Sequence, residues 1–211
     1  MARTAENHEH KKRELLEYAE KLFVEKGYEQ TSIDDILKAS GISKGGFYHY
    51  FKSKEDILSE SISNIIDEAV RYLNPVVNDK ELDALSKFRL FMIKKNEFQS
   101  SKLEYAALLA RLLQSDISQY KYSVVMAAKM IVPFAKIIEQ GAAEGVFKVD
   151  HPLQTADILI RAIISVTQSP LLAEYLSDQE KQRQYQIALK QIIAKTLGIS
   201  DDKFSLYGED V

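Results

Sequence analysis

A lysine-rich stretch near the N-terminus carries the side chains of this chain that are best suited to binding anions. Lys38, Lys44, Lys52 and Lys54 occur between residues 36 and 54 without any Asp or Glu, whereas the sequences on either side are acidic. The same stretch contains FYHYF at residues 47–51. Ammonium, phenol and imidazole groups can all donate hydrogen bonds to phosphate oxygens. Since the net charge of the whole chain is −3, any contact with nucleic acid must come from this local patch.

Capping signals around this patch predict two short helices joined by a tight turn. TSID at residues 31–34 is a capping box, in which the Thr31 side chain would accept a hydrogen bond from a free backbone amide at the start of a helix. That helix ends at Ser40-Gly41, and Ser43 caps the next helix only two residues further on. Helix, glycine turn and helix form the helix-turn-helix arrangement, which argues against a merely solvated lysine face.

Helices are also predicted on both sides of this motif. Apolar residues at helical spacing in HKKRELLEYAEKLFVEKGY predict a first helix that ends at Gly27, because glycine suits the residue that follows a helix. SKED at residues 53–56 is a second capping signal, and it begins a helix that runs to about residue 73.

The two glycines in SKGGF are consistent with a helix that approaches DNA closely. Each glycine costs about 1 kcal/mol relative to alanine inside a helix. In a helix-turn-helix protein the first turn of the second helix enters the major groove, where a residue without a side chain lets the backbone approach bases and phosphates. Helical spacing places Phe47, Tyr50 and Phe51 on one face for packing. Tyr48 and His49 then point outward, toward phosphates.

In these elements, residues 11–58 resemble the DNA-binding domain of the TetR family of bacterial transcriptional regulators. The first helix, GY, TS, GIS, a YxYF-like element and SKE follow one another in the family's order. The resemblance implies an all-α fold of about nine helices. It assigns residues 1–54 to a helix-turn-helix DNA-binding domain and residues 55–211 to a larger effector-binding and dimerisation domain, connected by helix 53–73. It further implies a homodimer that represses a promoter by binding a pseudo-palindromic operator in double-stranded DNA and leaves it when a small molecule binds.

The family's DNA contacts can be transferred to matching positions of this chain. The resemblance implies that Thr31 touches phosphate through its hydroxyl and backbone, and that Tyr48, His49 and Lys54 hold phosphates. Lys44 is the best candidate to bind guanine, because an ammonium can reach O6 and N7. The complete expected set is Thr31, Ser43, Lys44, Gly45, Gly46, Tyr48, His49 and Lys54.

Two positions depart from the family's pattern. Many members carry Thr or Ser where this chain has Gly46, so a hydroxyl contact is lost here. The histidine usually found just before the phenylalanine is Tyr50 in this chain, with His49 one place earlier. The individual roles of His49 and Tyr50 are therefore open.

The sequence contains no pattern typical of catalysis or metal binding. It has no P-loop, no Gly-x-Ser-x-Gly and no HExxH. With no cysteine and four scattered histidines, it offers no thiolate nucleophile and no zinc-ligand spacing. We therefore expect no enzyme activity, no cofactor and no metal. No apolar run approaches the roughly 18 residues of a membrane span, and the polar start lacks an export signal, so we expect a cytoplasmic protein without a membrane partner.

A segment near the C-terminus is apolar around much of its circumference. PLQTADILIRAIISVTQ, residues 152–168, predicts a helix that must be buried on more than one side. A second subunit is the simplest cover, with the helix YQIALKQIIAKTLG as companion, and the resembling family uses its two final helices in this way. Burial inside a single chain is the alternative. The expected interface residues are Leu153, Ile160, Ile163, Ile164, Ile192 and Ile193.

The middle of the chain supplies large, adaptable apolar side chains that suit a ligand cavity. The candidate pocket residues are Phe88, Phe91, Met92, Tyr105, Leu109, Met126, Met130 and Phe134. Packing in an ordinary core is the alternative for each of them. Glu97, Glu104 and Glu139 would favour a cationic ligand if they faced inward.

Three function classes follow from these observations. The leading one is a sequence-specific DNA-binding repressor that a small apolar or amphipathic ligand releases from its operator. The second is a DNA-binding dimer of the same fold that a protein partner controls. The third is a helical carrier or enzyme, which would need a convergent set of polar groups on a cavity wall, and the sequence displays none.

Overall fold

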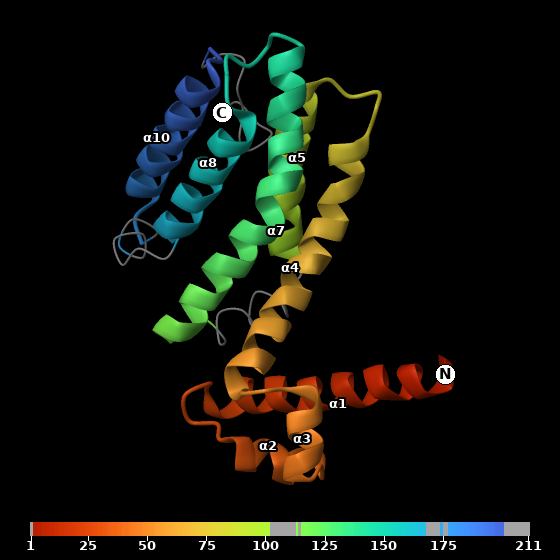
Figure 1. Ribbon diagram of the computed structural model, residues 1–211. Coiled ribbons are helices and arrows are strands. Elements are labelled where there is room, and N and C mark those ends of the chain that lie inside the picture. Colours follow the sequence, from red (N-terminus) through yellow and green to blue (C-terminus); the bar gives the residue numbers. More distant parts are fainter. Residues whose placement is uncertain (1, 102–112, 114, 168–173, 175–176, 201–211) are drawn as a thin grey trace. The chain divides into compact units, whose positions relative to one another are not determined.

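The structure, a computed structural model, describes residues 2–101, 113, 115–167, 174 and 177–200. Within these residues all regular secondary structure is α-helical (Figure 1), which confirms the all-α expectation. Tyr105, Leu109 and Glu104 lie outside the described residues. The helices are α1 (Ala2–Lys26), α2 (Ile33–Ser40), α3 (Lys44–Tyr50), α4 (Lys54–Asn78), α5 (Ala84–Ser101), α7 (Asp116–Ala143), α8 (Pro152–Thr167) and α10 (Gln179–Leu197).

The chain divides into two compact units. The first contains the described residues of Met1–Ile65 and Lys102–Val125, and the second contains those of Ile66–Ser101 and Met126–Val211. Helices α4 and α7 each contribute residues to both units. A functional boundary between residues 54 and 55 stays a prediction.

Helices α1 to α3 and the first turns of α4 supply the core of the first unit. On α1, buried residues recur every three or four positions, which aligns them along one face. Phe47 and Phe51 are 0% and 2% exposed, as the spacing of the rings predicts. Burying one such side chain contributes about 1.5–3 kcal/mol. The large buried residues of this core are Leu15, Leu16, Phe23, Tyr28, Ile36, Phe47, Phe51, Ile57, Leu58 and Ile62.

Polar caps and glycines set the ends of α2. The N-cap is Ser32 instead of Thr31: the Asp35 amide donates to Ser32 Oγ at 3.1 Å, and the Ser32 amide donates to Asp35 Oδ2 at 3.0 Å. The predicted capping box therefore exists but is displaced by one residue, because the Thr31 hydroxyl donates to the Gly27 carbonyl at 2.8 Å. Gly41 follows α2 with φ at +68°, which glycine adopts without strain.

Helix α4 continues beyond the end that the sequence predicts near residue 73. It begins as predicted after Ser53, whose Oγ accepts a hydrogen bond from the Asp56 amide at 3.1 Å, and it runs through Pro75 to Asn78. Pro75 removes one backbone hydrogen bond. Val76 and Val77, which follow it, are 3% and 6% exposed. Their burial, worth about 1.5–3 kcal/mol each, offsets the lost hydrogen bond.

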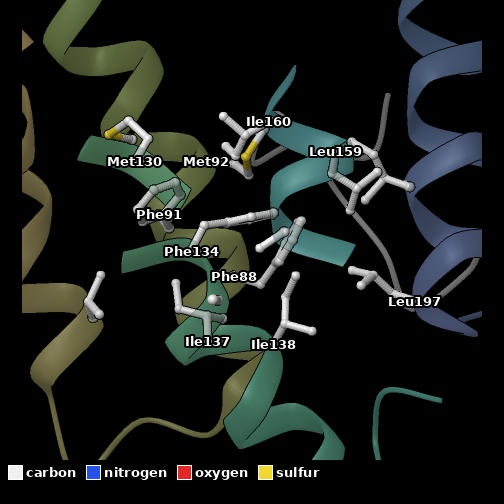
Figure 2. Close-up of a cluster of buried hydrophobic side chains, with 14 of the residues drawn as sticks. Phe88, Phe91, Met92, Met130, Phe134, Ile137, Ile138, Leu159, Ile160 and Leu197 are labelled. Carbon is white, nitrogen blue, oxygen red and sulfur yellow. The ribbon is translucent and has the colours of Figure 1, made fainter. Parts of the chain in front are cut away.

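The core of the second unit is built around contacting phenylalanines (Figure 2). The ring centroid of Phe134 lies 5.5 Å from that of Phe88 and 5.8 Å from that of Phe91. The Phe147 ring packs edge-on, 6.2 Å from Phe88. Such pairs contribute about 0.5–1.5 kcal/mol beyond the burial of their area.

Most of the described pocket candidates belong to this core. Phe88, Phe91, Met92, Met130 and Phe134 are buried members of the cluster, and the partly buried Met126 packs against it. Figure 2 shows the first five pointing into a shared cluster of side chains. This placement favours the core-packing alternative for these residues, and their role in a ligand pocket stays a prediction.

A buried lysine links segments of the second unit. Lys87 is 6% exposed, and its Nζ donates to the Val77 carbonyl at 3.2 Å and to Gln140 Oε1 at 2.7 Å. Gln140 Nε2 donates in turn to the Leu82 carbonyl at 2.9 Å and to Glu144 Oε1 at 2.6 Å. These bonds connect α4, α5 and α7 and give the buried ammonium the acceptors that it needs.

Part of the expected dimer interface is packed inside the chain. Ile160, Ile164 and Ile193 are 9%, 7% and 0% exposed and belong to the core of the second unit, and Ile163 packs against that core. The two isoleucines of α8 lie on one stripe with the buried Ala156, four and eight residues before them. This placement favours burial inside one chain for Ile160, Ile164 and Ile193, and the role of all four residues in a dimer interface stays a prediction.

The opposite faces of α8 and α10 expose large apolar side chains. Leu153 and Ile192, both expected at the interface, are 47% and 59% exposed. Ile158 and Ile187, apolar residues of the same two helices outside the expected interface set, are 66% and 45% exposed. Each helix thus has a second apolar face that its own chain leaves uncovered within the described residues.

Candidate nucleic-acid interface

The first turn of α3 is exposed at the surface of the first unit. Ser43 caps this helix, because its Oγ accepts a hydrogen bond from the Gly46 amide at 3.1 Å. Ser43, Lys44 and Gly45 are exposed together at the N-terminal end of the second helix of a helix-turn-helix. This is the part of such a motif that meets base edges in a major groove. Contact between these residues and DNA stays a prediction.

The two glycines of this turn have different surroundings. A methyl group on Gly45 would meet no heavy atom within 4 Å. On Gly46 it would lie 2.8 Å from Ile42 Cγ1 and 3.3 Å from Ser43 Oγ. Close internal packing therefore explains Gly46, whereas the open surface at Gly45 remains consistent with close approach of DNA.

The remaining rings of α3 face outward or toward the start of α1. Tyr48 is 48% exposed and His49 is exposed, as the helical spacing predicts. Tyr50 is half-buried, and its ring centroid lies 4.8 Å from that of His8. Both outward rings can donate to phosphate oxygens from this position.

The N-terminal turns of α1 add a contact that the sequence analysis missed. Helix α1 begins at Ala2, well before the apolar spacing that starts near residue 15. These extra turns place the His8 ring 5.1 Å from the ring of His49. The run ENHEHKKRE has no apolar period, so only its concentration of histidine and lysine could have pointed to this contact.

A cleft of 420 Å³ lies between α1 and the start of α3. Lys11, Glu14 and Tyr18 of α1 line one wall, and Ser43 and His49 belong to the other. Lys11 Nζ lies 3.6 Å from the Glu14 carboxylate. The cleft shares Ser43 and His49 with the exposed surface of α3, so the two features form one candidate surface.

Thr31 does not lie at this surface. It is 1% exposed, and its hydroxyl donates to the carbonyls of Gly27 at 2.8 Å and Leu22 at 3.3 Å. The expected contact of this hydroxyl with phosphate is therefore wrong, because the hydroxyl closes the turn after α1. The neighbouring Ser32 is exposed, but its hydroxyl donates to Asp35 Oδ2 at 2.8 Å.

The ammonium group of Lys54 is also used inside the first unit. Its Nζ donates to the carbonyls of Tyr28 at 2.7 Å and Thr31 at 2.9 Å, and the Glu29 carbonyl lies at 3.5 Å. The same Nζ lies 4.2 Å from the centroid of the Tyr28 ring. An ammonium has three hydrogens to donate, and these contacts account for them. The expectation that Lys54 holds phosphate is therefore replaced by a positioning role: it fastens α4 to the loop before α2.

Other lysines of the patch remain accessible. Lys38, Lys44 and Lys52 are all exposed, and none forms an ion pair with a carboxylate of the described residues. Their exposed ammonium groups belong to the same unit as the exposed Tyr48 and His49. The patch that the sequence predicts is thus present, with Lys54 removed from it.

The helix-turn-helix and its flanking helices match a known family. The sequence profile described as "Bacterial regulatory proteins, tetR family" matches residues 15–60 of this chain. Residues 15–60 are therefore similar to the DNA-binding domain of the TetR family. The matched residues run from within α1 to the first turns of α4. They include the whole candidate surface except the start of α1.

Characterised and uncharacterised transcriptional regulators are similar to this chain over most of its length. The HTH-type transcriptional regulator YfiR of Bacillus subtilis (strain 168) is 27% identical over 165 residues, which cover 72% of this chain and 75% of YfiR. The HTH-type transcriptional repressor KstR2 of Mycolicibacterium smegmatis is 28% identical over 160 residues, which cover 73% of this chain and 74% of KstR2.

Solved structures agree on the fold. SmeT, the repressor of the Stenotrophomonas maltophilia multidrug efflux pump SmeDEF, aligns with a TM-score of 0.64 at 19% identity, covering 94% of each chain. Reduced NemR of E. coli aligns with a TM-score of 0.55 at 21% identity, covering 86% of this chain and 97% of NemR. At these identities the likeness concerns the fold alone.

Among the described residues, no helix combines the length and apolarity that crossing a membrane requires.

Proposed function

We propose that this chain is a TetR-family, sequence-specific DNA-binding regulator that represses transcription and leaves its operator when a small ligand binds. The observation that carries the proposal is the exposed first turn of α3, where Ser43, Lys44 and Gly45 lie at the N-terminus of the second helix of a helix-turn-helix. The similarity to KstR2, a named transcriptional repressor, supports repression.

The exposed side chains divide into a base-reading group and a phosphate-binding group. Lys44 is the candidate for guanine, because its ammonium is exposed and can reach O6 and N7 in the major groove. Tyr48 and His49 supply a phenol and an imidazole for phosphates on the same helix. The exposed Lys52 takes the phosphate-binding role first expected of Lys54.

The exposed apolar faces of α8 and α10 form the contact between two copies in this proposal. Leu153, Ile158, Ile187 and Ile192 are each at least 45% exposed, and covering large apolar side chains favours association. A two-fold dimer presents two copies of α3, so its operator is a pseudo-palindrome with half-sites about one helical turn, roughly 34 Å, or a multiple of it apart.

The larger helical unit receives the ligand in this proposal. SmeT, which shares the fold at low identity, has also been solved in complex with triclosan, which supports a small-molecule site in this architecture. An effector that prefers the form without DNA by about 2–3 kcal/mol would lower operator affinity roughly 30- to 150-fold.

Selection of bound sequences from random double-stranded DNA tests the DNA-binding half of the proposal. We expect enrichment of one pseudo-palindrome. Lys44→Ala should change the preferred base at one position of each half-site, by about 1–3 kcal/mol, whereas Tyr48→Phe should weaken binding to all sequences alike. Failure of the wild-type protein to enrich any sequence would refute the proposal, and uniform weakening by Lys44→Ala would remove its base-reading role.

Calorimetry tests whether a small ligand releases the protein from its operator. A ligand that weakens operator binding must itself bind more weakly to the protein–operator complex, by the same factor. Candidate ligands are therefore titrated with and without operator. Ligands that bind equally well in both titrations would point instead to control by a protein partner.

A further inference from the structure

The inward face of α1 continues toward the N-terminus beyond the residues that match the TetR family. Leu16 and Ala19 are buried on this face. Lys12 and His8 precede Leu16 by four and eight residues, so helical spacing places them on the same side. Both are half-buried, whereas residues 9–11 between them are exposed. His8 therefore lies on the side of α1 that faces the rest of the first unit.

Lys12 holds this part of α1 in place. Its Nζ lies 2.6 Å from Glu60 Oε1 of α4 and 5.4 Å from the centroid of the Phe51 ring. Phe51 is the residue that follows α3 and caps its end. Through these two contacts the turn that carries His8 has a defined place beside α3.

His8, His49 and Tyr50 form a cluster in which each ring contacts the other two. The centroid of the His8 ring lies 5.1 Å from that of His49 and 4.8 Å from that of Tyr50, and the His49 and Tyr50 centroids are 5.1 Å apart. The planes of the two imidazoles meet at 78°, the edge-to-face arrangement that aromatic rings favour. Within the cluster Tyr50 is half-buried and His49 is exposed. The outward ring is thus supported by two rings behind it.

Contact with these two rings restricts His49 before DNA binds. An exposed side chain loses rotational freedom when it is fixed on a phosphate, and this loss lowers affinity. His49 is exposed and is one of the side chains to which the proposed function gives a phosphate. A ring that already holds the imidazole reduces the freedom that remains to be lost. Such pre-organisation raises affinity without adding a contact with the ligand.

We propose that His8 is a positioning residue for operator binding: its ring, supported by Tyr50, holds the His49 imidazole in the orientation that donates to a phosphate oxygen. This inference rests on the proposed DNA-binding function. It makes the start of α1 a part of the DNA-binding surface that acts through α3, and it gives Tyr50 a supporting role.

Affinity of the full-length protein for the operator sequence selected from random DNA tests the proposal. The variants are His8→Ala, which removes the ring, His8→Phe, which keeps a ring, and His49→Ala, alone and combined with His8→Ala. His10→Ala is the matched control. His10 is exposed, lies two residues further along the helix, and pairs with Glu14 at 3.7 Å.

His8→Ala should weaken operator binding roughly 3- to 10-fold, the range expected for ordering one side chain. His8→Phe should restore most of this loss, and His10→Ala should bind as the wild type does. In the His49→Ala background, His8→Ala should cause no further loss, because the group that it positions is gone.

A loss of equal size in both backgrounds would overturn the proposal, since it would come from a direct contact of His8 with DNA or from a disturbed fold. Unchanged affinity in His8→Ala would overturn it as well. So would a His8→Phe variant that binds as weakly as His8→Ala.

A measurement without DNA separates this inference from the proposed function. The chain has four histidines, so NMR of protein with isotope-labelled histidine resolves their ring protons. We expect a nuclear Overhauser effect between the rings of His8 and His49, and its absence would refute the positioning role alone. A wild type that selects an operator but shows no coupling between positions 8 and 49 also refutes only this role. A wild type that shows the ring contact but selects no operator refutes the proposed function, and the positioning role with it.

Discussion

The ammonium nitrogen of Lys54 lies 2.9 Å from the carbonyl oxygen of Thr31, to which it donates a hydrogen bond. Lys54 is the first residue of α4, and Thr31 directly precedes Ser32, the N-cap of α2. This bond and its companion to the Tyr28 carbonyl, at 2.7 Å, fix the start of α2 against the start of α4. A lysine beside the candidate DNA surface therefore acts on the shape of that surface.

Replacing Lys54 with methionine should destabilise the first unit. Two backbone carbonyls lose a charged donor, which we expect to lower the free energy of unfolding by about 1–3 kcal/mol. Operator affinity should fall for all sequences, because α2 is less firmly placed, while the slope of log affinity against log salt stays unchanged. Urea denaturation and salt-dependent binding assays measure the two effects.

Lys52→Met is the matched control. Lys52 is exposed and pairs with no carboxylate of the part of the chain that the structure describes. If it binds phosphate, its loss should reduce the salt slope by about one unit without changing stability. The opposite pattern, a reduced slope for Lys54→Met at unchanged stability, would restore Lys54 to the phosphate-binding group.

The two glycines of α3 should respond differently to alanine. At Gly45 there is space for a methyl group, so Gly45→Ala should raise the free energy of unfolding by about 0.4–1 kcal/mol through the helix propensity of alanine. It should weaken operator binding if DNA approaches this backbone closely. Gly46→Ala should instead destabilise, by about 1–3 kcal/mol, because the methyl group would lie 2.8 Å from Ile42 Cγ1. Equal stabilisation by both changes, in thermal denaturation, would disprove this distinction.

Glutamate substitutions on the exposed faces of α8 and α10 test whether these faces form the dimer interface. Ile158→Glu and Ile192→Glu should leave the fold intact, since these side chains are 66% and 59% exposed. Each should weaken the dimer by about 2 kcal/mol or more if the interface covers it, and lower operator affinity as well. Ile193→Glu, at a fully buried position, should unfold the second unit instead. Sedimentation that still shows a stable dimer for both surface variants would place the interface elsewhere.

Asp35 should contribute to the loss of folding stability at low pH. The Ser32 amide, the Ser32 hydroxyl and Lys26 at 3.1 Å hold the pKa of this carboxylate well below its usual range. Because the folded pKa is the lower one, Asp35 stabilises the fold above its unfolded pKa of about 4. That contribution is lost as pH falls from there through the folded pKa.

Asp35→Asn isolates this contribution. At neutral pH the variant should be less stable than the wild type in urea denaturation. The difference between the two should shrink as pH falls below about 4, while other carboxylates affect both proteins alike. A difference that stays constant from pH 7 to about pH 3 would show that the charge of Asp35 does not support the cap.

Local signals were sufficient to predict the helix-turn-helix. The glycine turn and the caps at Ser43 and Ser53 depend only on residues a few positions away in the sequence. The structure contains all three features. The cap of α2 was predicted one residue early, because Thr31 and Ser32 can both cap a helix. The choice depends on Gly27, whose carbonyl takes the Thr31 hydroxyl.

The sequence did not reveal which partner each buried or exposed group would find. Ile158 and Ile160 read as equally apolar, yet one is 66% and the other 9% exposed, since two residues apart on a helix means nearly opposite faces. An apolar period shows that a helix has a face to bury, and the packing of distant helices determines which face that is. From the sequence, Lys54 was predicted to bind phosphate. In the folded chain its ammonium donates instead to the carbonyls of residues 28 and 31. The role of a cation depends on the groups around it, and groups distant in the chain are brought together only by folding.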